Sequence, residues 1–182
     1  MPLIKLNTQS ATTLDATKLT GNLPAISGAS LTGISAGIVV ADNWRLSSTI
    51  STDTTPLTNW ERVDTAVQGT IGTSMGFSSG NFTFPQTGIW FVSSSCLIQE
   101  GSSTDNLLQF TMTFGGTDIM QIYLETAMSG GFNTGYNSTL LDVSDLSNTL
   151  SFKFVNVTAG AELRGSSTEN LTNATFLRLG DT

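Results

Sequence analysis

The strongest constraint on the fold is a strict two-residue alternation in several short segments. In LLQFTMTF (107–114), Leu108, Phe110, Met112 and Phe114 alternate with glutamine and threonine, and TLSFKFV (149–155) and IMQIYLET (119–126) repeat the pattern. Successive side chains of a β-strand point to opposite faces, so each segment predicts a strand with one buried face. Helical periodicity is almost absent after residue 37.

Similar short segments continue along the chain. Further strand candidates are 41–47, 59–64, 74–77, 81–84, 88–99, 133–143, 161–165 and 174–180. Turn signals such as SSGN, PQTG and FGGTD separate them. About ten short strands at close, regular spacing predict an all-β antiparallel jelly-roll sandwich. We assign this head domain to residues 37–182 and an extended arm to residues 1–36, where SATTLDATKL carries the only helical signal.

The composition excludes several classes of function. The net charge is −7, and the seven Lys and Arg residues are scattered, which argues against nucleic acid and anionic membranes as partners. The absence of histidine removes Ser-His-Asp and Cys-His catalysis and the commonest metal ligand. Cys96 is the single cysteine, and its apolar neighbours indicate a buried thiol. Trp44, Trp60 and Trp90 are expected in the core or an interface rather than in a sugar site. We predict neither an enzyme nor a cofactor.

Two groups of acidic residues could hold Ca²⁺, namely Glu100 with Asp105 and Asp118, and Asp142 with Asp145. Solvated loop carboxylates are the ordinary alternative in so acidic a chain, and without EF-hand spacing we predict no metal. The N-terminal MPLIKLNTQS lacks the apolar region of a signal peptide, and no apolar stretch approaches the ~18 residues of a membrane span. The sequence therefore predicts synthesis in the cytoplasm and no membrane partner.

The segment GNFTFPQTGIWFVSSSCL (80–97) carries the most specific motif of the head. Pro85 has no N–H for a ladder and ends a strand, and Gly88 suits a tight turn. The motif resembles the Gly-x-Phe-Thr-x-Pro and Gly-Ile/Val-Tyr-x-Phe sequences of globular heads in the tumour necrosis factor and complement component 1q superfamily, with Trp90 at the usual tyrosine. NWERVD, MGF and the terminal ATFLRLGD resemble other strands of that superfamily, so the resemblance covers roughly residues 40–182.

This resemblance implies a ten-stranded jelly roll that forms a homotrimer through flat aromatic faces. The run Trp90, Phe91 and Val92 is apolar on both faces, as expected of a strand covered by the partner sheet on one side and by a neighbouring subunit on the other. In the closing strand, the resemblance places the pair Phe176 and Leu177 next to the threefold axis. These five residues are the predicted trimer interface or core.

The arm repeats Leu-Thr-Gly within TKLTGNLPAISGASLTGI (17–34), and its apolar residues are too sparse for a core of its own. The segment resembles Leu-Thr-Gly segments in fibre and other virion proteins of tailed bacteriophages. The resemblance implies three arms that wind around one axis or order on a capsid. The predicted docking and trimerisation residues are Leu19, Leu23, Pro24, Ile26, Leu31 and Ile34. A plain disordered tail is the alternative.

Together these features predict a non-enzymatic homotrimer on the virion surface, attached to the major capsid protein or to tail or portal components. The short length, and the lack of an adaptor domain before the arm, favour a capsid decoration (cement) protein. The arm also fits a tail or head fibre or knob that presents loops 100–106 and 126–135 to a host-cell surface. A soluble complement-like module that binds carbohydrate or protein is the third possibility, which the arm and the missing signal peptide disfavour.

Overall fold

The computed structural model describes residues 37–101, 107–125, 130–158 and 160–182, which form eleven strands and no helix. In chain order the strands are β1 (Val40–Leu46), β2 (Trp60–Arg62), β3 (Gly76–Ser78), β4 (Asn81–Thr83), β5 (Gly88–Gln99), β6 (Leu108–Phe114), β7 (Thr117–Leu124), β8 (Phe132–Val143), β9 (Leu150–Val155), β10 (Glu162–Leu163) and β11 (Asn173–Gly180). Each of these strands overlaps one of the segments expected from the sequence.

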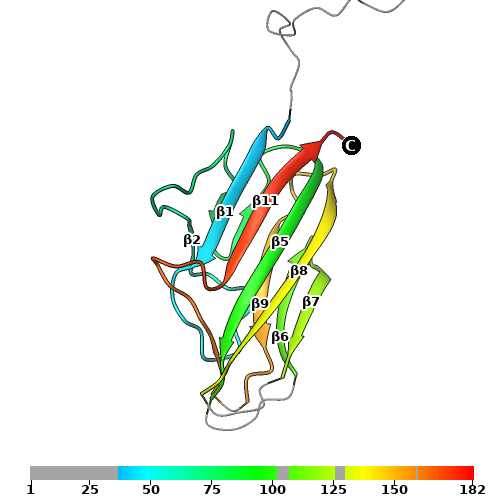
Figure 1. Cartoon of the computed structure of the whole chain (residues 1–182). Helices are drawn as coiled ribbons and strands as arrows, with labels where there is room; N and C mark the ends of the chain where they lie inside the picture. Colours follow the sequence, from blue (N-terminus) through cyan, green and yellow to red (C-terminus); the bar gives the residue numbers. More distant parts are fainter. Residues whose placement is uncertain (1–36, 102–106, 126–129, 159) are drawn as a thin grey trace, which may run out of the picture. The chain divides into compact units, whose positions relative to one another are not determined.

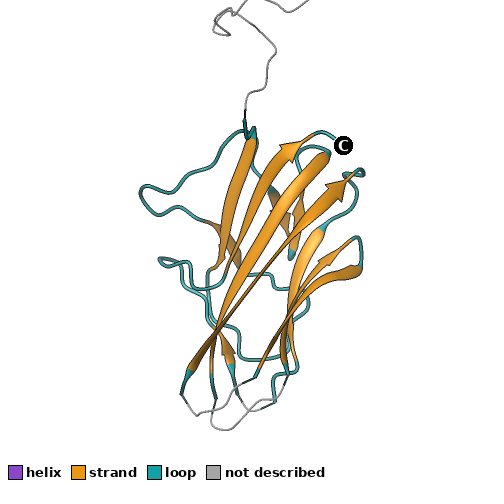
Figure 2. Ribbon diagram, turned by 45° about the vertical axis from the view of Figure 1, so that its right-hand side comes forward, coloured by secondary structure: helices purple, strands orange, loops and turns teal. Residues whose placement is uncertain are grey.

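The strands form two antiparallel sheets that pack face to face as a sandwich. Sheet A has the order β10-β5-β11-β1-β2, with β8 also paired to β5, and sheet B has the order β3-β4-β9-β6-β7. Figure 1 shows β1, β11, β5 and β8 side by side in one layer, and Figure 2 shows strands of both layers. The predicted all-β antiparallel jelly-roll sandwich is therefore confirmed.

The long strand β5 organises sheet A. It pairs with β8 over its full length, from Gly88 opposite Val143 to Gln99 opposite Phe132. Its other edge pairs with β11 and then with β10. Successive side chains of β5 point alternately into the sandwich and out of it, as in any β-strand. The side chains on the outer face of sheet A are therefore regularly spaced.

The core lies between the sheets and follows the predicted alternation. The inward residues of β9, Leu150, Phe152 and Phe154, have no exposed surface. Phe82 lies at the centre of an aromatic cluster, and its ring centroid is 5.3 Å from that of Trp44 and 5.2 Å from that of Phe176. Edge-to-face and tilted pairs at such separations stabilise a core beyond simple burial of area.

The tryptophans and the cysteine that the sequence predicts to be buried are buried in the structure. Trp44, Trp60 and Trp90 all belong to the core, which confirms their packing role within the sandwich. Cys96 also lies inside, and burial raises the pKa of its thiol to about 12, although a hydrogen bond with the backbone of Gly135 opposes the shift. The thiol is therefore protonated and structural at neutral pH.

The predicted division at residues 36 and 37 falls where the described part of the head begins. It therefore stays a prediction. The helical candidate SATTLDATKL and the Leu-Thr-Gly segment also lie outside the described residues.

Candidate assembly interface

An apolar row crosses the outer face of sheet A. Ladder partners in an antiparallel sheet carry their side chains on the same face. Phe91 on β5 lies opposite Leu140 of β8 and opposite Leu177 of β11. Leu177 in turn lies opposite Ala41 of β1, and Ala41 forms an isolated bridge with Ile71. We call Leu140, Phe91, Leu177, Ala41 and Ile71 the apolar row.

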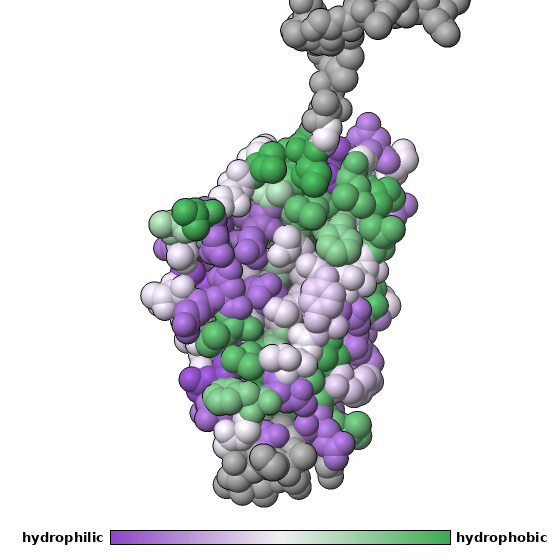
Figure 3. Space-filling model, in the orientation of Figure 1, coloured by the Kyte–Doolittle hydropathy of each residue, from purple (hydrophilic) through white to green (hydrophobic). Residues whose placement is uncertain are grey.

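The ends of the apolar row are open to solvent. Leu140 is 64% exposed and Ile71 is 50% exposed, whereas Phe91 and Leu177 in the middle are half-buried. Ile38 and Leu179, at the same end of the sheet, are also exposed. Figure 3 shows hydrophobic side chains gathered at the end of this face where β1 begins and β11 ends. Contiguous exposed apolar side chains are typical of interaction surfaces, so this end of sheet A is the candidate interface.

Next to the apolar row, small polar side chains cover the middle of the face. Thr175 donates a hydrogen bond of 3.3 Å from Oγ1 to Asn43 Oδ1, and Asn173 donates from Nδ2 to Ser95 Oγ at 2.7 Å. Short side chains that hydrogen-bond one another keep the face flat and leave few donors or acceptors in need of water. Tyr136, opposite Ser95, is 66% exposed. The face therefore places apolar, aromatic and paired polar groups side by side, and exposed aromatic residues such as Tyr136 are enriched in protein interfaces.

The structure divides the predicted interface or core residues of the head between two faces. Trp90, Val92 and Phe176 point into the sandwich and have no exposed surface, and the Trp90 indole donates from Nε1 to the Gln86 carbonyl at 3.2 Å. Phe91 and Leu177 point outward and lie in the apolar row. Within this pattern only the outward pair can touch a neighbouring subunit, and that role stays a prediction.

Sequence reasoning missed the contribution of β8 to this face. Phe132, Tyr136 and Leu140 recur every fourth residue, and all three are exposed. Residues four apart on a strand share a face, so this spacing alone could have identified them. Ile71 carried no such signal, because it reaches the row through a bridge from a loop.

The predicted arm residues Leu19, Leu23, Pro24, Ile26, Leu31 and Ile34 lie outside the described residues. Their docking and trimerisation role stays a prediction. The first described residue is Gly37, three residues before β1 begins. The chain therefore enters the head at the end of sheet A that carries the apolar row, since Ala41 is the second residue of β1.

Two of the acidic residues considered as calcium ligands, Asp118 and Asp145, have other contacts. Asp118 forms an ion pair with Lys153, whose Nζ lies 2.7 Å from Asp118 Oδ2, and this hydrogen bond lowers the pKa of the carboxyl. Asp145 accepts from the Ser147 N–H at 2.8 Å, which lowers its pKa. Asp105 lies outside the described residues. Within the described ranges, no cluster of three or more potential metal-ligating side chains is present.

A separate open cavity of about 320 Å³ lies at one end of sheet B, lined by Leu107, Tyr123, Leu124 and Glu125. Its volume is at the lower limit of small-molecule sites. Across the described part of the chain, no helix is long and apolar enough to cross a membrane.

Comparison with solved structures defines the class of fold. Eiger TNF from S. frugiperda superposes with a TM-score of 0.61 and 14% identity, over 80% of this chain and 95% of that chain. Murine APRIL superposes with a TM-score of 0.56 and 12% identity, over 77% of this chain and 98% of that chain. The head is therefore a jelly roll of the tumour necrosis factor and complement component 1q type, as the motif at 80–97 predicted.

The other comparisons do not identify a function for this chain. Vertex protein P5 of PRD1 superposes over 80% of this chain and all of that chain with 15% identity, but its TM-score of 0.49 is too low to support a functional argument. No protein-family model matches the sequence, and no curated protein matches it. At identities of 12–15% the likeness shows the fold alone.

Proposed function

We propose that this chain is a non-enzymatic structural protein that forms a homotrimer through the outer face of sheet A. The observation that carries the proposal is the apolar row with its exposed ends, Leu140 and Ile71. Proteins of the TNF-like fold typically form homotrimers, and members of the fold are non-enzymatic binding proteins. An exposed apolar face on such a head is best explained by burial against copies of itself.

The energetics agree with a self-association surface. Full burial of a leucine or phenylalanine side chain contributes roughly 1.5–3 kcal/mol. Leu140, Phe91 and Leu177 from each of three subunits would place nine such side chains in the interface, because a threefold ring repeats each contact three times. Phe91 and Leu177 are already half-buried within the head, so each contributes less than Leu140. Left in water, the same face would be a site of uncontrolled association.

We further propose that the trimer is a capsid decoration protein on the surface of a tailed-bacteriophage virion, with residues 1–36 as the arm and residues 37–182 as the head. The support is the likeness of residues 17–34 to virion-protein segments. Three arms bound to one particle multiply individually weak contacts into avidity. The partners of the arm would then be the major capsid protein or a neighbouring virion component.

The test is attachment to particles. Purified full-length protein is mixed with capsids of the encoding phage that lack it, and the mixture is sedimented. Co-sedimentation at three chains per site, lost when residues 1–36 are deleted, supports decoration. Binding to tails but not to capsids would replace decoration by the fibre or knob role. No binding to any part of the particle would refute the virion assignment.

The open cavity beside Tyr123 is the one observation that favours a second role, a binding module for a small ligand. Its exposed tyrosine ring and its glutamate are groups that contact sugars. A module of this kind needs neither a capsid nor an arm. A glycan that binds wild-type protein but not Tyr123→Ala, in protein that does not attach to particles, would favour this alternative.

A further inference from the structure

The tip of the loop between β2 and β3 is an exposed valine with a strained backbone, Val67. Val67 has φ 73°, in the left-handed region that β-branched residues avoid, and its side chain is fully exposed. Such a conformation costs roughly 1–3 kcal/mol and persists only when its surroundings impose it. The described part of the head offers the Val67 side chain no covering contact that would offset the strain.

Both ends of this loop are fixed to β1. At the first end, the buried Arg45 guanidinium donates to Glu61 Oε1 at 2.7 Å, to Thr65 Oγ1 at 2.8 Å and to the carboxylate of Asp64. At the second end, Ile71 and Ala41 exchange backbone hydrogen bonds of 2.9 and 3.0 Å. Between them a turn is closed by the Gln68 N–H on the Thr65 carbonyl at 3.1 Å. These hydrogen bonds hold both ends of the loop and therefore fix the position of its tip, Val67.

The second end of the loop is also the end of the apolar row, since Ile71 is its last member. In a ring of three, each subunit has two different contact patches. The first patch of one subunit contacts the second patch of the next subunit. The row runs from Leu140 on β8 at one edge of sheet A to Ile71 beyond the other edge. A ring that closes through the two ends of the row would bring the Ile71 end of one copy toward the β8 edge of the next.

We propose that the β2–β3 loop is an intersubunit clasp, whose tip Val67 packs against the β8 edge of a second copy of this chain. The receiving surface is the exposed pair Leu140 and Tyr136. The strain at Val67 is then compensated in the assembly, because the apolar side chain that is exposed in one head becomes buried between two. This inference rests on the proposed homotrimer and assigns the loop a place in it.

The chain offers a matched control. Leu107 is also apolar, well exposed and held at a positive φ of 72°, but it precedes β6 of sheet B. Glycine adopts positive φ without strain, so Val67→Gly and Leu107→Gly should both leave the head folded. Asparagine tolerates the same region, so Val67→Asn removes the apolar contact without the flexibility of glycine.

The experiment measures the mass of full-length wild type, Val67→Gly, Val67→Asn and Leu107→Gly by sedimentation over a dilution series, with circular dichroism as the check on folding. Both Val67 variants should dissociate at concentrations roughly tenfold higher than wild type, since a buried valine is lost from each contact. Leu107→Gly should dissociate like wild type.

The outcomes separate the clasp from the trimer itself. A wild-type monomer would refute both proposals. A wild-type trimer whose Val67 variants dissociate at the wild-type concentration would overturn the clasp alone. Val67 variants that stay trimeric but fail to bind capsids would also overturn it, because the tip would then contact another protein.

Discussion

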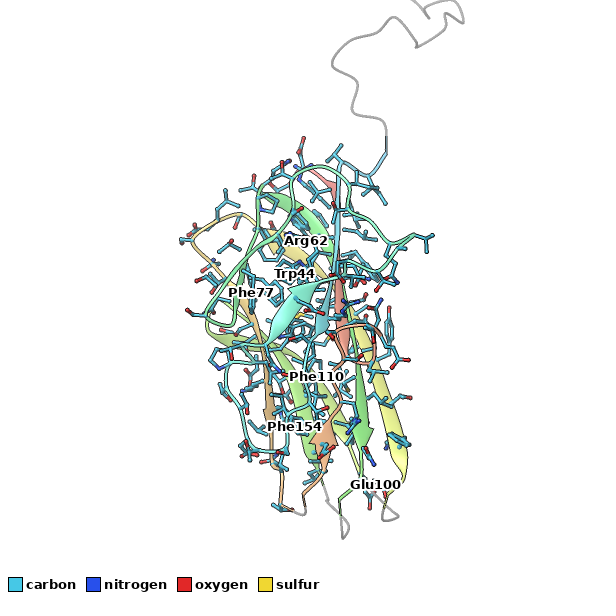
Figure 4. The ribbon with its side chains drawn as sticks, turned by 90° about the vertical axis from the view of Figure 1, so that its left-hand side faces the viewer. Trp44, Arg62, Phe77, Glu100, Phe110 and Phe154 are labelled. Atoms are coloured by element: carbon cyan, nitrogen blue, oxygen red, sulfur yellow. The ribbon has the colours of Figure 1, made fainter. Side chains whose placement is uncertain are left out.

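The guanidinium of Arg62 lies over the indole ring of Trp44, with the Arg62 Cζ 4.7 Å from the ring centroid. Figure 4 shows Arg62, Trp44 and Phe77 in the same part of the sandwich, and the ring centroids of Trp44 and Phe77 are 5.4 Å apart. Arg62 also donates from Nε to Asp42 Oδ1 at 3.1 Å and from the guanidinium to the Met75 carbonyl at 2.9 Å. One side chain therefore joins the edge of sheet A to the segment that leads into sheet B.

Asp42→Ala should destabilise the head by about 3 kcal/mol or more. The buried carboxylate accepts from the Trp44 Nε1–H at 3.0 Å and from the Met75 N–H at 2.9 Å. Its removal leaves two buried donors without acceptors, and each such loss costs roughly 1–3 kcal/mol. Urea unfolding at fixed protein concentration measures the change. Asp42→Asn keeps one acceptor oxygen and should lose less; equal losses would contradict this account.

The Asp118–Lys153 pair should make stability depend on pH in the acid range. The hydrogen bond from Lys153 lowers the pKa of Asp118 below its ordinary value of 3.8. A lowered folded pKa contributes stability above the unfolded value, and that stability is lost as the pH falls through the folded value. The pair is partly exposed, so Asp118→Asn should cost at most about 1 kcal/mol at pH 7. Unfolding curves should converge with wild type well below pH 3.8, and a difference that persisted there would exclude the mechanism.

Cys96 should be unreactive while the head is folded. Burial raises the pKa of its thiol to about 12, so almost no thiolate exists at pH 8. A thiol reagent such as dithionitrobenzoate should label no cysteine in native protein and one per chain in urea. Rapid labelling of native protein would show that β5 and β8 open where Cys96 lies opposite Gly135.

Leu140→Asp should weaken the trimer more than any equally exposed change on sheet B. A charge at this end of the apolar row loses the burial of a leucine, roughly 1.5–3 kcal/mol per contact, and adds the cost of desolvating a carboxylate. The dissociation concentration should rise by more than about tenfold. Tyr123→Asp on sheet B is the control, since Tyr123 is exposed to a similar extent. Equal behaviour of the two variants would mean that sheet A is not the interface.

Local pattern predicted the strands well, because alternation and turn residues are local properties. The run 88–99 was expected as one strand and is β5, since every second residue from Trp90 to Ile98 faces the core. The burial of Asp42 and Arg45 could not be predicted from the local sequence pattern. Both are charged residues of β1 and both are buried, through partners at positions 61–64 and 75 that only the folded chain brings near.

The candidate interface could be predicted from the sequence only in part. The motif resemblance pointed to Phe91 and Leu177, which the register places side by side. It did not separate them from Trp90, Val92 and Phe176, because an apolar run without alternation does not reveal which residues face outward. The contribution of Ile71 depends on a bridge to Ala41, thirty positions away in the sequence.

Deletion of residues 1–36 should leave a folded head that no longer attaches to capsids. The described core lies entirely within residues 40–176, so the far-ultraviolet spectrum of the head should keep its β character. Attachment depends on the proposed arm and should fall to background in the sedimentation assay. A deletion variant that decorates particles normally would show that the head itself docks.

The most direct test of the central claim is the mass of the purified full-length protein in solution by light scattering. The account predicts a mass near three times the chain mass of 19.2 kDa. A trimer that Leu140→Asp dissociates would establish the apolar row as its interface. A monomer at micromolar concentration would contradict the proposed assembly.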